Sequence, residues 1–220
     1  MPLIVVTTLF LAIQGHCFNL LMQDNRVMNA RIRLFEPTNK FQIISEAPQA
    51  GLEKTEIQNY IEKLLLGKEE KVRGGGEQQL VLDFSGYDQG AAEGEIQNVN
   101  FYHTIFGLRV LNHVGKMSFV NSIPVSYSTN FNNSATWQIS NCTDNNGHSL
   151  SETTQYASSI LGGQLDKSIP VEKVAVQTNQ TTLSVAWGMT INNDEGSPLY
   201  HVALDSCNLT FVYFVNYTAS

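Results

Sequence analysis

The sequence predicts a mainly β fold, either an antiparallel sandwich or an elongated β-sheet module, with one amphipathic helix near residues 53–66. Apolar and polar residues alternate along several runs after residue 80, and stretches rich in Asn and Gly, which favour turns, separate these runs. One earlier segment has instead the three- and four-residue spacing of an apolar helix face. Because 42% of the 220 residues are hydrophobic, the chain can build a sizeable core.

The N-terminal region is expected to form one or two short strands followed by the helix. The strands are predicted within residues 32–35 and 41–44, with Pro37 and Pro48 as breaks. Gly67 is expected to end the helix. The polar face of the helix is not basic, so we expect its apolar stripe to pack on a sheet and not on a membrane surface. The stripe consists of Ile57, Tyr60, Ile61, Leu64 and Leu65.

The remaining elements are predicted strands. Trp137 and Ile139 are expected on a return strand after a turn at residues 132–134, and a further turn is expected at Asn179. The longest unbroken alternation, over residues 183–191, is the strongest strand signal. The other alternating runs cover residues 80–84, 99–105, 123–131, 174–176 and 211–217.

Three parts of the chain are expected. Residues 1–17 are predicted to be a signal peptide, and residues 18–76 an N-terminal α+β segment that ends in a Gly-rich linker. Residues 77–220 are predicted to be a β-rich domain, either separate from 18–76 or forming one domain with it. The glycines at 74–76 lack the spacing of a phosphate-binding loop.

The N-terminus predicts a secreted protein. Residues 3–13 are apolar and uncharged, and Gly15 and Cys17 are small residues suited to cleavage before Phe18. The apolar run is shorter than the ~20 residues that a membrane-spanning helix needs.

Secretion implies further covalent features. Loss of the leader leaves two cysteines, Cys142 and Cys207, which we expect to form a disulfide in an oxidising compartment. Five asparagines match the acceptor pattern for N-glycosylation, although a chain rich in Asn, Ser and Thr produces several matches by chance. Asn179 is the best candidate because it lies in a predicted turn. The five are Asn132, Asn141, Asn179, Asn208 and Asn216.

Charge and motifs exclude several functions. Eleven of the 13 Lys and Arg residues lie at or before Lys116, and no basic patch for nucleic acid is apparent. Asp83 with Asp88, and Asp194 with Glu195, fit ordinary turns better than catalytic pairs. No motif for an enzyme, metal or cofactor is found. Four histidines match no zinc spacing: His103, His113, His148 and His201. His103 and His201 lie in apolar strand contexts and are expected in the core or at its rim.

Uncharged strands rich in Ser and Thr carry one resemblance. No Asp, Glu, Lys or Arg occurs in residues 118–140. The segment from about 116 to 191 resembles the membrane-inserting module of aerolysin-type β-pore-forming proteins. The resemblance implies a membrane-active toxin or defence protein that binds a membrane or cell-surface receptor and forms a homo-oligomer. The matching stretches are 125–131 and 149–156 as strands, then 168–176 and 183–191 as a Pro-containing turn and hairpin.

The alternative is a secreted, non-catalytic binding module of barrel or sandwich type. Its ligand would be a lipid, a carbohydrate or a protein, and a small apolar or sugar ligand would need a concave pocket. A late group of aromatic residues fits either a core or a ligand platform: Tyr200, Phe211, Tyr213, Phe214 and Tyr217.

Overall fold

A computed structural model describes residues 32–48, 50–67, 78–88, 92–131, 137–140 and 147–217. The chain divides into two compact units. The N-terminal unit comprises residues 36–139 and 179–183, and the C-terminal unit comprises 1–35, 140–178 and 184–220. Antiparallel strands dominate both units, which confirms the predicted mainly β fold. Within the N-terminal unit, the helix and the strands that follow it share one core.

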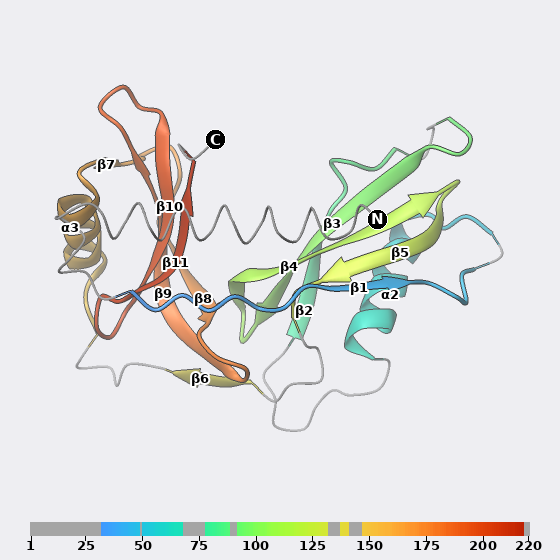
Figure 1. Cartoon of the computed structure of the whole chain (residues 1–220), viewed down its shortest axis with the longest axis horizontal. Coiled ribbons are helices and arrows are strands. Elements are labelled where there is room, and N and C mark those ends of the chain that lie inside the picture. The colour runs from blue at the N-terminus through green and yellow to red at the C-terminus, as the bar shows by residue number, and fades with distance from the viewer. Residues whose placement is uncertain are drawn as a thin grey trace, which may run out of the picture. The chain divides into compact units, whose positions relative to one another are not determined.

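The N-terminal unit is built on an antiparallel sheet in which the strands lie in the order β2, β3, β4, β5 and β1 (Figure 1). The register pairs Leu80 with His103 and Met117 with Tyr127. The strands are β1 (Lys40–Ile43), β2 (Gln78–Asp83), β3 (Ile96–Ile105), β4 (Leu108–Val120) and β5 (Ile123–Thr129).

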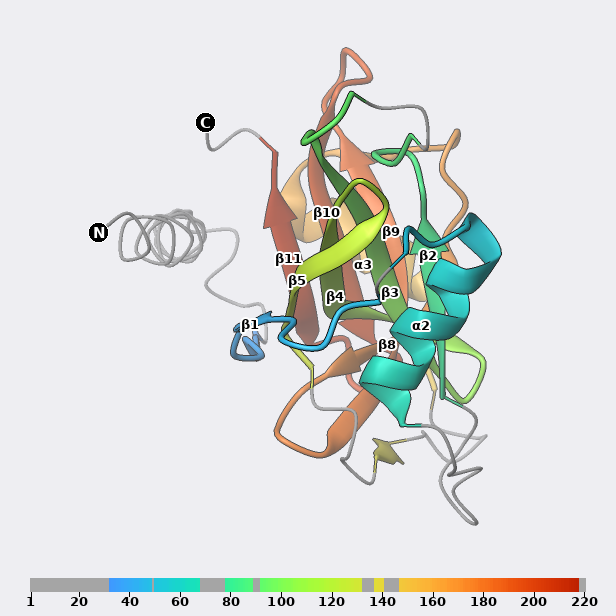
Figure 2. The ribbon, with the colours of Figure 1, turned by 90° about the vertical axis from the view of Figure 1, so that its right-hand side faces the viewer.

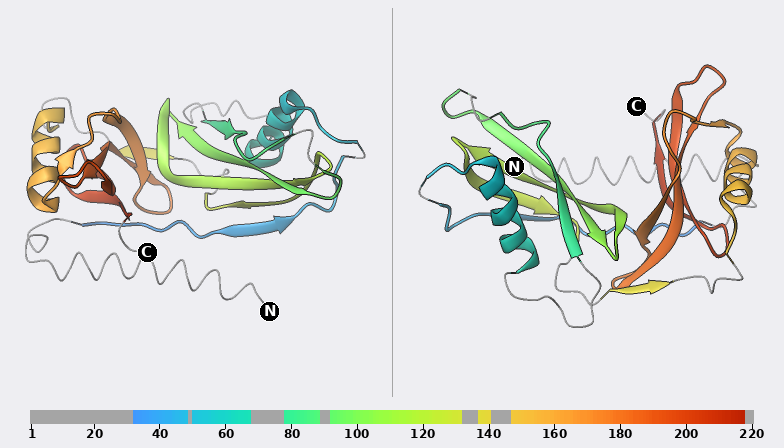
Figure 3. Two further views of the ribbon diagram at one scale, coloured as in Figure 1. Left: turned by 90° about the horizontal axis from the view of Figure 1, so that it is seen from above. Right: turned by 180° about the vertical axis from the view of Figure 1, so that it is seen from behind.

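Helix α2 (Lys54–Leu66) covers one face of this sheet, as Figures 2 and 3 show. The Glu53 amide donates to the Glu56 carboxylate at 2.8 Å, and Gly67, with φ of 72°, ends the helix. The predicted stripe is confirmed at Ile57, Ile61 and Leu65, which are buried, whereas Leu64 is exposed. They pack with a group of sheet and loop residues: Leu80, Tyr87, Val99, Phe101, Met117, Phe119 and Phe131.

Gly115 on β4 makes room for an aromatic ring on the neighbouring strand. Phe101 pairs with Gly115 across β3 and β4, and a methyl group at residue 115 would overlap the Phe101 ring. The ring in turn meets Phe131 edge-on, with 6.3 Å between centroids. Without a side chain at this position, the covered face accommodates both aromatic rings.

Strand β1 lies at the end of the sheet and buries little. All four of its residues are exposed, and Phe41 and Ile43 keep 58% and 77% of their surface accessible. These two side chains alternate with Lys40 and Gln42, which pair with Thr129 and Tyr127 on the α2 side of the sheet.

The C-terminal unit is a second antiparallel sheet with α3 (Leu150–Leu161) packed against its core. Figure 3 shows this helix beside the sheet. Strand β9 is buried on nearly its whole length, so both of its faces are covered. Neither described helix is long and apolar enough to cross a bilayer. The strands are β7 (Gln164–Leu165), β8 (Glu172–Gln177), β9 (Thr182–Asn192), β10 (Pro198–Asp205) and β11 (Phe211–Asn216).

Helix α3 corrects one sequence prediction. Residues 149–156 were expected as a strand, but all except the capping residue Ser149 are helical. Ser149 Oγ accepts from the Glu152 amide, and the Glu152 carboxylate accepts from the Ser149 amide at 2.8 Å. This capping box starts the helix, and Gly162, in the left-handed region, ends it. The Ser-x-x-Glu signal is present in the sequence, and the Ser/Thr-rich composition obscured it.

Other differences concern strands. Strands β4 and β10 were not expected as such, and residues 32–35 form only a single bridge, from Ile32 to Phe211. The strand β6 (Gln138–Ser140) does not return along β5, because the Gln138 amide donates to the Thr181 carbonyl. In β4 the inward positions include His113 and Gly115, which break the apolar alternation expected of a half-buried strand.

We predict that Gly115→Ala lowers the free energy of unfolding by about 1–3 kcal/mol, because the added methyl group forces the Phe101 ring or the backbone to move. Urea denaturation measures this change. Lys116→Ala is the matched control, since its exposed side chain belongs to the adjacent position of β4. Equal stability of the two variants would contradict the packing described here.

Candidate functional site

Two histidines meet in the core of the N-terminal unit. His103 lies on β3 and His113 on β4, and both side chains are fully buried. The regular register pairs Tyr102 with Val114 and shifts before Thr104, so the histidines lie where the pairing becomes irregular. Their Nδ1 atoms are 3.2 Å apart, which is hydrogen-bonding distance.

The two imidazoles meet head to head. Their centroids are 5.4 Å apart with an angle of 22° between the ring planes, as expected when the two Nδ1 atoms face each other. One ring must donate its N–H and the other must offer a lone pair, so the hydrogen-bonded pair cannot carry a proton on both Nδ1 atoms. His103 Nε2 is buried and has no hydrogen-bond partner among the described residues. An unpaired lone pair is more readily tolerated than an unpaired N–H, so we assign His103 Nδ1–H as the donor.

Aromatic rings surround the pair. The Phe131 centroid lies 4.7 Å from that of His103 and 5.3 Å from that of His113, and Trp137 lies 5.0 Å from His113. Burial in these surroundings and, to a smaller extent, the neighbouring His113 together lower the pKa of His103 to about 3. His103 is therefore neutral at physiological pH.

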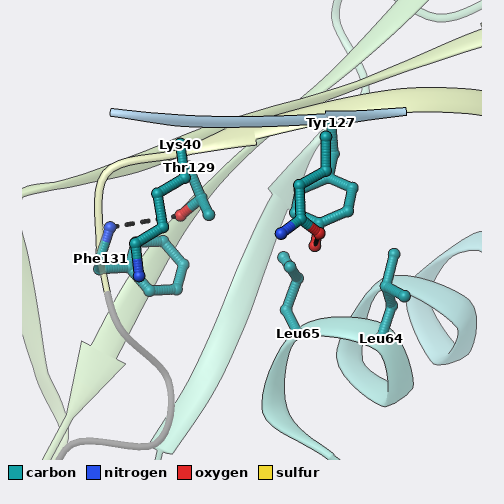
Figure 4. A pocket seen from close by; sticks show the side chains of 7 residues that line it. Lys40, Leu64, Leu65, Tyr127, Thr129 and Phe131 are labelled. Atoms are coloured by element: carbon teal, nitrogen blue, oxygen red, sulfur yellow. Dashed lines mark hydrogen bonds between the residues drawn. The ribbon is translucent and has the colours of Figure 1, made fainter. Parts of the chain in front are cut away.

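A small open pocket lies on the same face of the sheet, between α2 and strands β1 and β5 (Figure 4). Its volume is about 110 Å³. The Phe131 ring, which packs on both histidines, also forms part of the pocket wall, and its amide donates to Thr129 Oγ1. The lining residues are Lys40, Gln42, Leu64, Leu65, Tyr127, Thr129 and Phe131.

The pocket joins an apolar wall to polar groups. Leu64, Leu65 and Phe131 supply the wall, and the Lys40 side chain extends from β1 toward Phe131 (Figure 4). The Tyr127 hydroxyl donates to the Gln42 side-chain carbonyl. Burial raises the pKa of Tyr127, so the phenol is uncharged and Lys40 provides the one formal charge of the lining.

The sequence also predicts one disulfide and five glycosylation sites. Cys142, Asn132 and Asn141 fall outside the described residues, so the disulfide remains a prediction. The Cys207 amide donates to Asp205 Oδ1 in the turn after β10.

Asn179 occupies the turn expected there, and its Oδ1 accepts from the amides of Thr181 and Thr182. Asn208 is exposed in the turn before β11, and its Oδ1 accepts from the amide of Thr210 at 2.9 Å. Asn216 ends β11 opposite Tyr200 and is half-buried. Asn208 is thus the most accessible of the described sequons.

The other histidines do not join the pair. The His201 ring contacts Thr190 Oγ1 at 3.1 Å in the C-terminal unit. His148 precedes α3, 4.0 Å from the Glu152 carboxylate. Among the described residues, no three His, Cys, Asp or Glu side chains form a group that could hold a metal ion.

The acidic residues lie in hydrogen-bonded turns, and the C-terminal aromatic residues differ in burial. Asp83 accepts from the backbone and hydroxyl of Ser85, and these hydrogen bonds lower its pKa. The Glu195 amide donates to Asn193 in the β9–β10 turn. Of the aromatic group, Phe211 is buried in the core, whereas Tyr217 is 54% exposed.

Sequence reasoning did not identify the pocket residues. Lys40, Gln42 and Tyr127 lie on two strands that are far apart in the chain and pair in the sheet. Of the histidine pair, only His103 was expected in the core or at its rim, and its full burial confirms that expectation. The burial of His113 was not predicted.

No known family model matches this chain, and no curated protein matches it in sequence.

We predict that the histidine pair makes the fold sensitive to acid. The pKa of His103 is lower in the folded chain, so between about pH 6.5 and 3 the unfolded chain binds the proton first. The contribution of His103 to the free energy of unfolding is therefore fully present above about pH 6.5. It is lost as the pH drops toward 3, by up to about 1.4 kcal/mol per pH unit.

Urea denaturation at pH 7 and pH 5 measures this loss, and His103→Asn should reduce it. His148→Asn, at a partly exposed position, should keep the wild-type dependence. If the His103 and His148 variants lose stability equally with acid, the pair does not have the proposed effect.

Proposed function

We propose that this chain is a secreted, non-catalytic binding protein and that its pocket binds a small organic anion with a short apolar tail. The observation that carries the proposal is the meeting of Lys40 with the apolar wall of Leu64, Leu65 and Phe131. Small-molecule sites typically combine such a wall with a few convergent polar groups.

Size and charge limit the ligand. The pocket, at about 110 Å³, is smaller than the ~150 Å³ cavity known to hold benzene, so it suits a tail of a few carbon atoms. The Lys40 ammonium favours a carboxylate or sulfonate, and Thr129 and Gln42 offer neutral hydrogen-bonding groups. Tyr127 retains its proton because burial raises its pKa, and no nucleophile in the lining is paired with a base, which favours binding over catalysis.

We predict that butyrate and 1-propanesulfonate bind at the pocket, and that butylammonium does not. Chemical-shift changes in a ¹H–¹⁵N NMR titration report both the site and the affinity. Lys40→Met should weaken anion binding about fivefold, because it removes an exposed charge whose contribution is on the order of 1 kcal/mol.

Lys116→Met is the matched control. It removes the same charge from the opposite face of the same sheet, since Lys116 pairs with Ser128 and not with the pocket strand positions. Equal weakening by both variants would mean that binding is non-specific, and equal binding of butylammonium would exclude an anion site.

The proposal includes export and covalent maturation. Supporting it are the apolar leader, the two cysteines that follow it and the exposed position of Asn208. We propose that residues 1–17 are removed, that Cys142 and Cys207 form a disulfide, and that N-linked glycans are attached to at least one sequon.

We predict that cells of a eukaryotic secretory line that express the full-length chain release into the medium a product whose first residue is Phe18. Intact mass before and after N-glycosidase measures the glycan, which Asn208→Gln should reduce. Thiol alkylation should require prior reduction. Retention inside the cell with two reactive thiols would overturn this part of the proposal.

The membrane-active alternative, with a ring of copies as its oligomer, has narrower support. The hairpin of β4 and β5 places Ser118 opposite Ser126 on one face and Met117 opposite Tyr127 on the other, the alternation that a barrel strand needs. Its uncharged part on β4, however, is confined to Met117–Val120, and a barrel strand takes about 9–11 residues. Dye release from liposomes with SDS-resistant oligomers would favour this alternative over ligand binding.

A further inference from the structure

The Phe131 side chain contacts the histidine pair and also lines the pocket. Its ring packs on both members of the histidine pair, with centroid distances of 4.7 and 5.3 Å, and it forms part of the pocket wall. It lies two residues after the end of β5, and its amide donates to the hydroxyl of Thr129, another pocket residue. If the imidazoles move, the Phe131 ring that packs on them must move as well, and the shape of the pocket wall changes.

Protonation of both imidazoles is incompatible with the observed geometry. The neutral pair holds one N–H and one lone pair between the Nδ1 atoms, 3.2 Å apart. The first added proton goes to His103 Nε2, which is buried and has no partner among the described residues. A second proton would set two N–H groups against each other, so the doubly charged pair must separate.

Within the described residues, the titratable groups around the pair come from the sheet, from helix α2 and from the loop after β2. On this face of the sheet, β3 and β4 contribute His103 and His113 themselves, and the inward residues of β2 are uncharged. Strands β1 and β5 contribute Lys40 and Tyr127, both in the pocket lining. Helix α2 contributes Tyr60, and the loop after β2 contributes Tyr87. Helix α2 also carries Glu62, whose carboxylate accepts from Gln58, and Gln58 donates to the carbonyl of Leu80, the residue paired with His103. Among the described residues, His103 Nε2 makes no hydrogen bond to this carboxylate, so a proton added there is not stabilised by a direct ion pair.

We propose that the His103–His113 pair is an acid switch for the pocket: protonation separates the imidazoles, Phe131 moves with them, and the ligand is released. The inference deepens the proposed function and rests on the pocket being the binding site. The protein then holds its anion at neutral pH and releases it in an acidic compartment.

Opening of the histidine pair and release of the ligand are measured by two separate experiments. Incorporation of 5-fluorotryptophan gives the mature chain two ¹⁹F signals, assigned with Trp187→Phe. Trp137 contacts His113, whereas Trp187 packs in the core of the C-terminal unit. We expect the Trp137 signal to change with a midpoint between pH 6.5 and 3 while the Trp187 signal stays constant. A change of both signals at one midpoint indicates global unfolding and overturns the switch.

Affinity is then measured with 1-propanesulfonate, whose charge does not change over this range. We expect at least a tenfold loss of affinity across the Trp137 midpoint. The double variant His103→Asn with His113→Asn can keep an amide hydrogen bond but cannot titrate, so its affinity should stay constant. Unchanged affinity in the wild type, or an equal loss in the double variant, overturns the switch.

Two further measurements keep the outcomes distinct. If the double variant does not fold, ¹⁵N NMR of the wild-type imidazoles decides, because the pair must take up protons together with the Trp137 change. If the wild type does not bind 1-propanesulfonate at pH 7.4, the proposed function fails, whereas the Trp137 transition still decides whether acid opens the pair.

Discussion

The N-terminal unit depends on the burial of one sheet face beneath helix α2. Ile57, Ile61 and Leu65 from the helix meet Val99, Met117 and Phe119 from the sheet, all of them buried. Burial of such side chains is the main favourable term in folding, and each contributes on the order of 1.5–3 kcal/mol. The histidine pair and the pocket both depend on this covered face. The histidine pair lies on it, and the pocket opens where the helix and β1 leave the face incompletely covered.

The sequence predicted the elements whose patterns are strong and local. Helix α2 was predicted to within a residue, since its stripe and Gly67 are both readable. Strand β9 was predicted from its alternation. Helix α3 was missed because Ser and Thr dilute its stripe, which leaves Thr153 and Ala157 as its fully buried residues, and the capping box was the better signal.

The candidate site could not be predicted in the same way, because it depends on pairing between distant strands. His103 and His113 are ten residues apart, which matches no ligand motif, and only the register of β3 against β4 sets their nitrogens face to face. The pocket likewise needs β1 beside β5, more than 80 residues along the chain. A single sequence gives strand periodicity but not strand order, so side chains that meet across the sheet remain unidentified until the fold is known.

The exposure of β1 has a consequence for the behaviour of the protein at high concentration. A strand at the end of a sheet presents unpaired peptide groups, and natural proteins usually protect such edges with charges, bulges or proline. Here the strand is only four residues long and carries a single charge, Lys40, whereas Phe41 and Ile43 are open to solvent. Its shortness limits the number of hydrogen bonds that another chain could add. A bound anion would neutralise Lys40, which is the charge that protects this edge. Ligand binding would therefore favour self-association of the protein through β1.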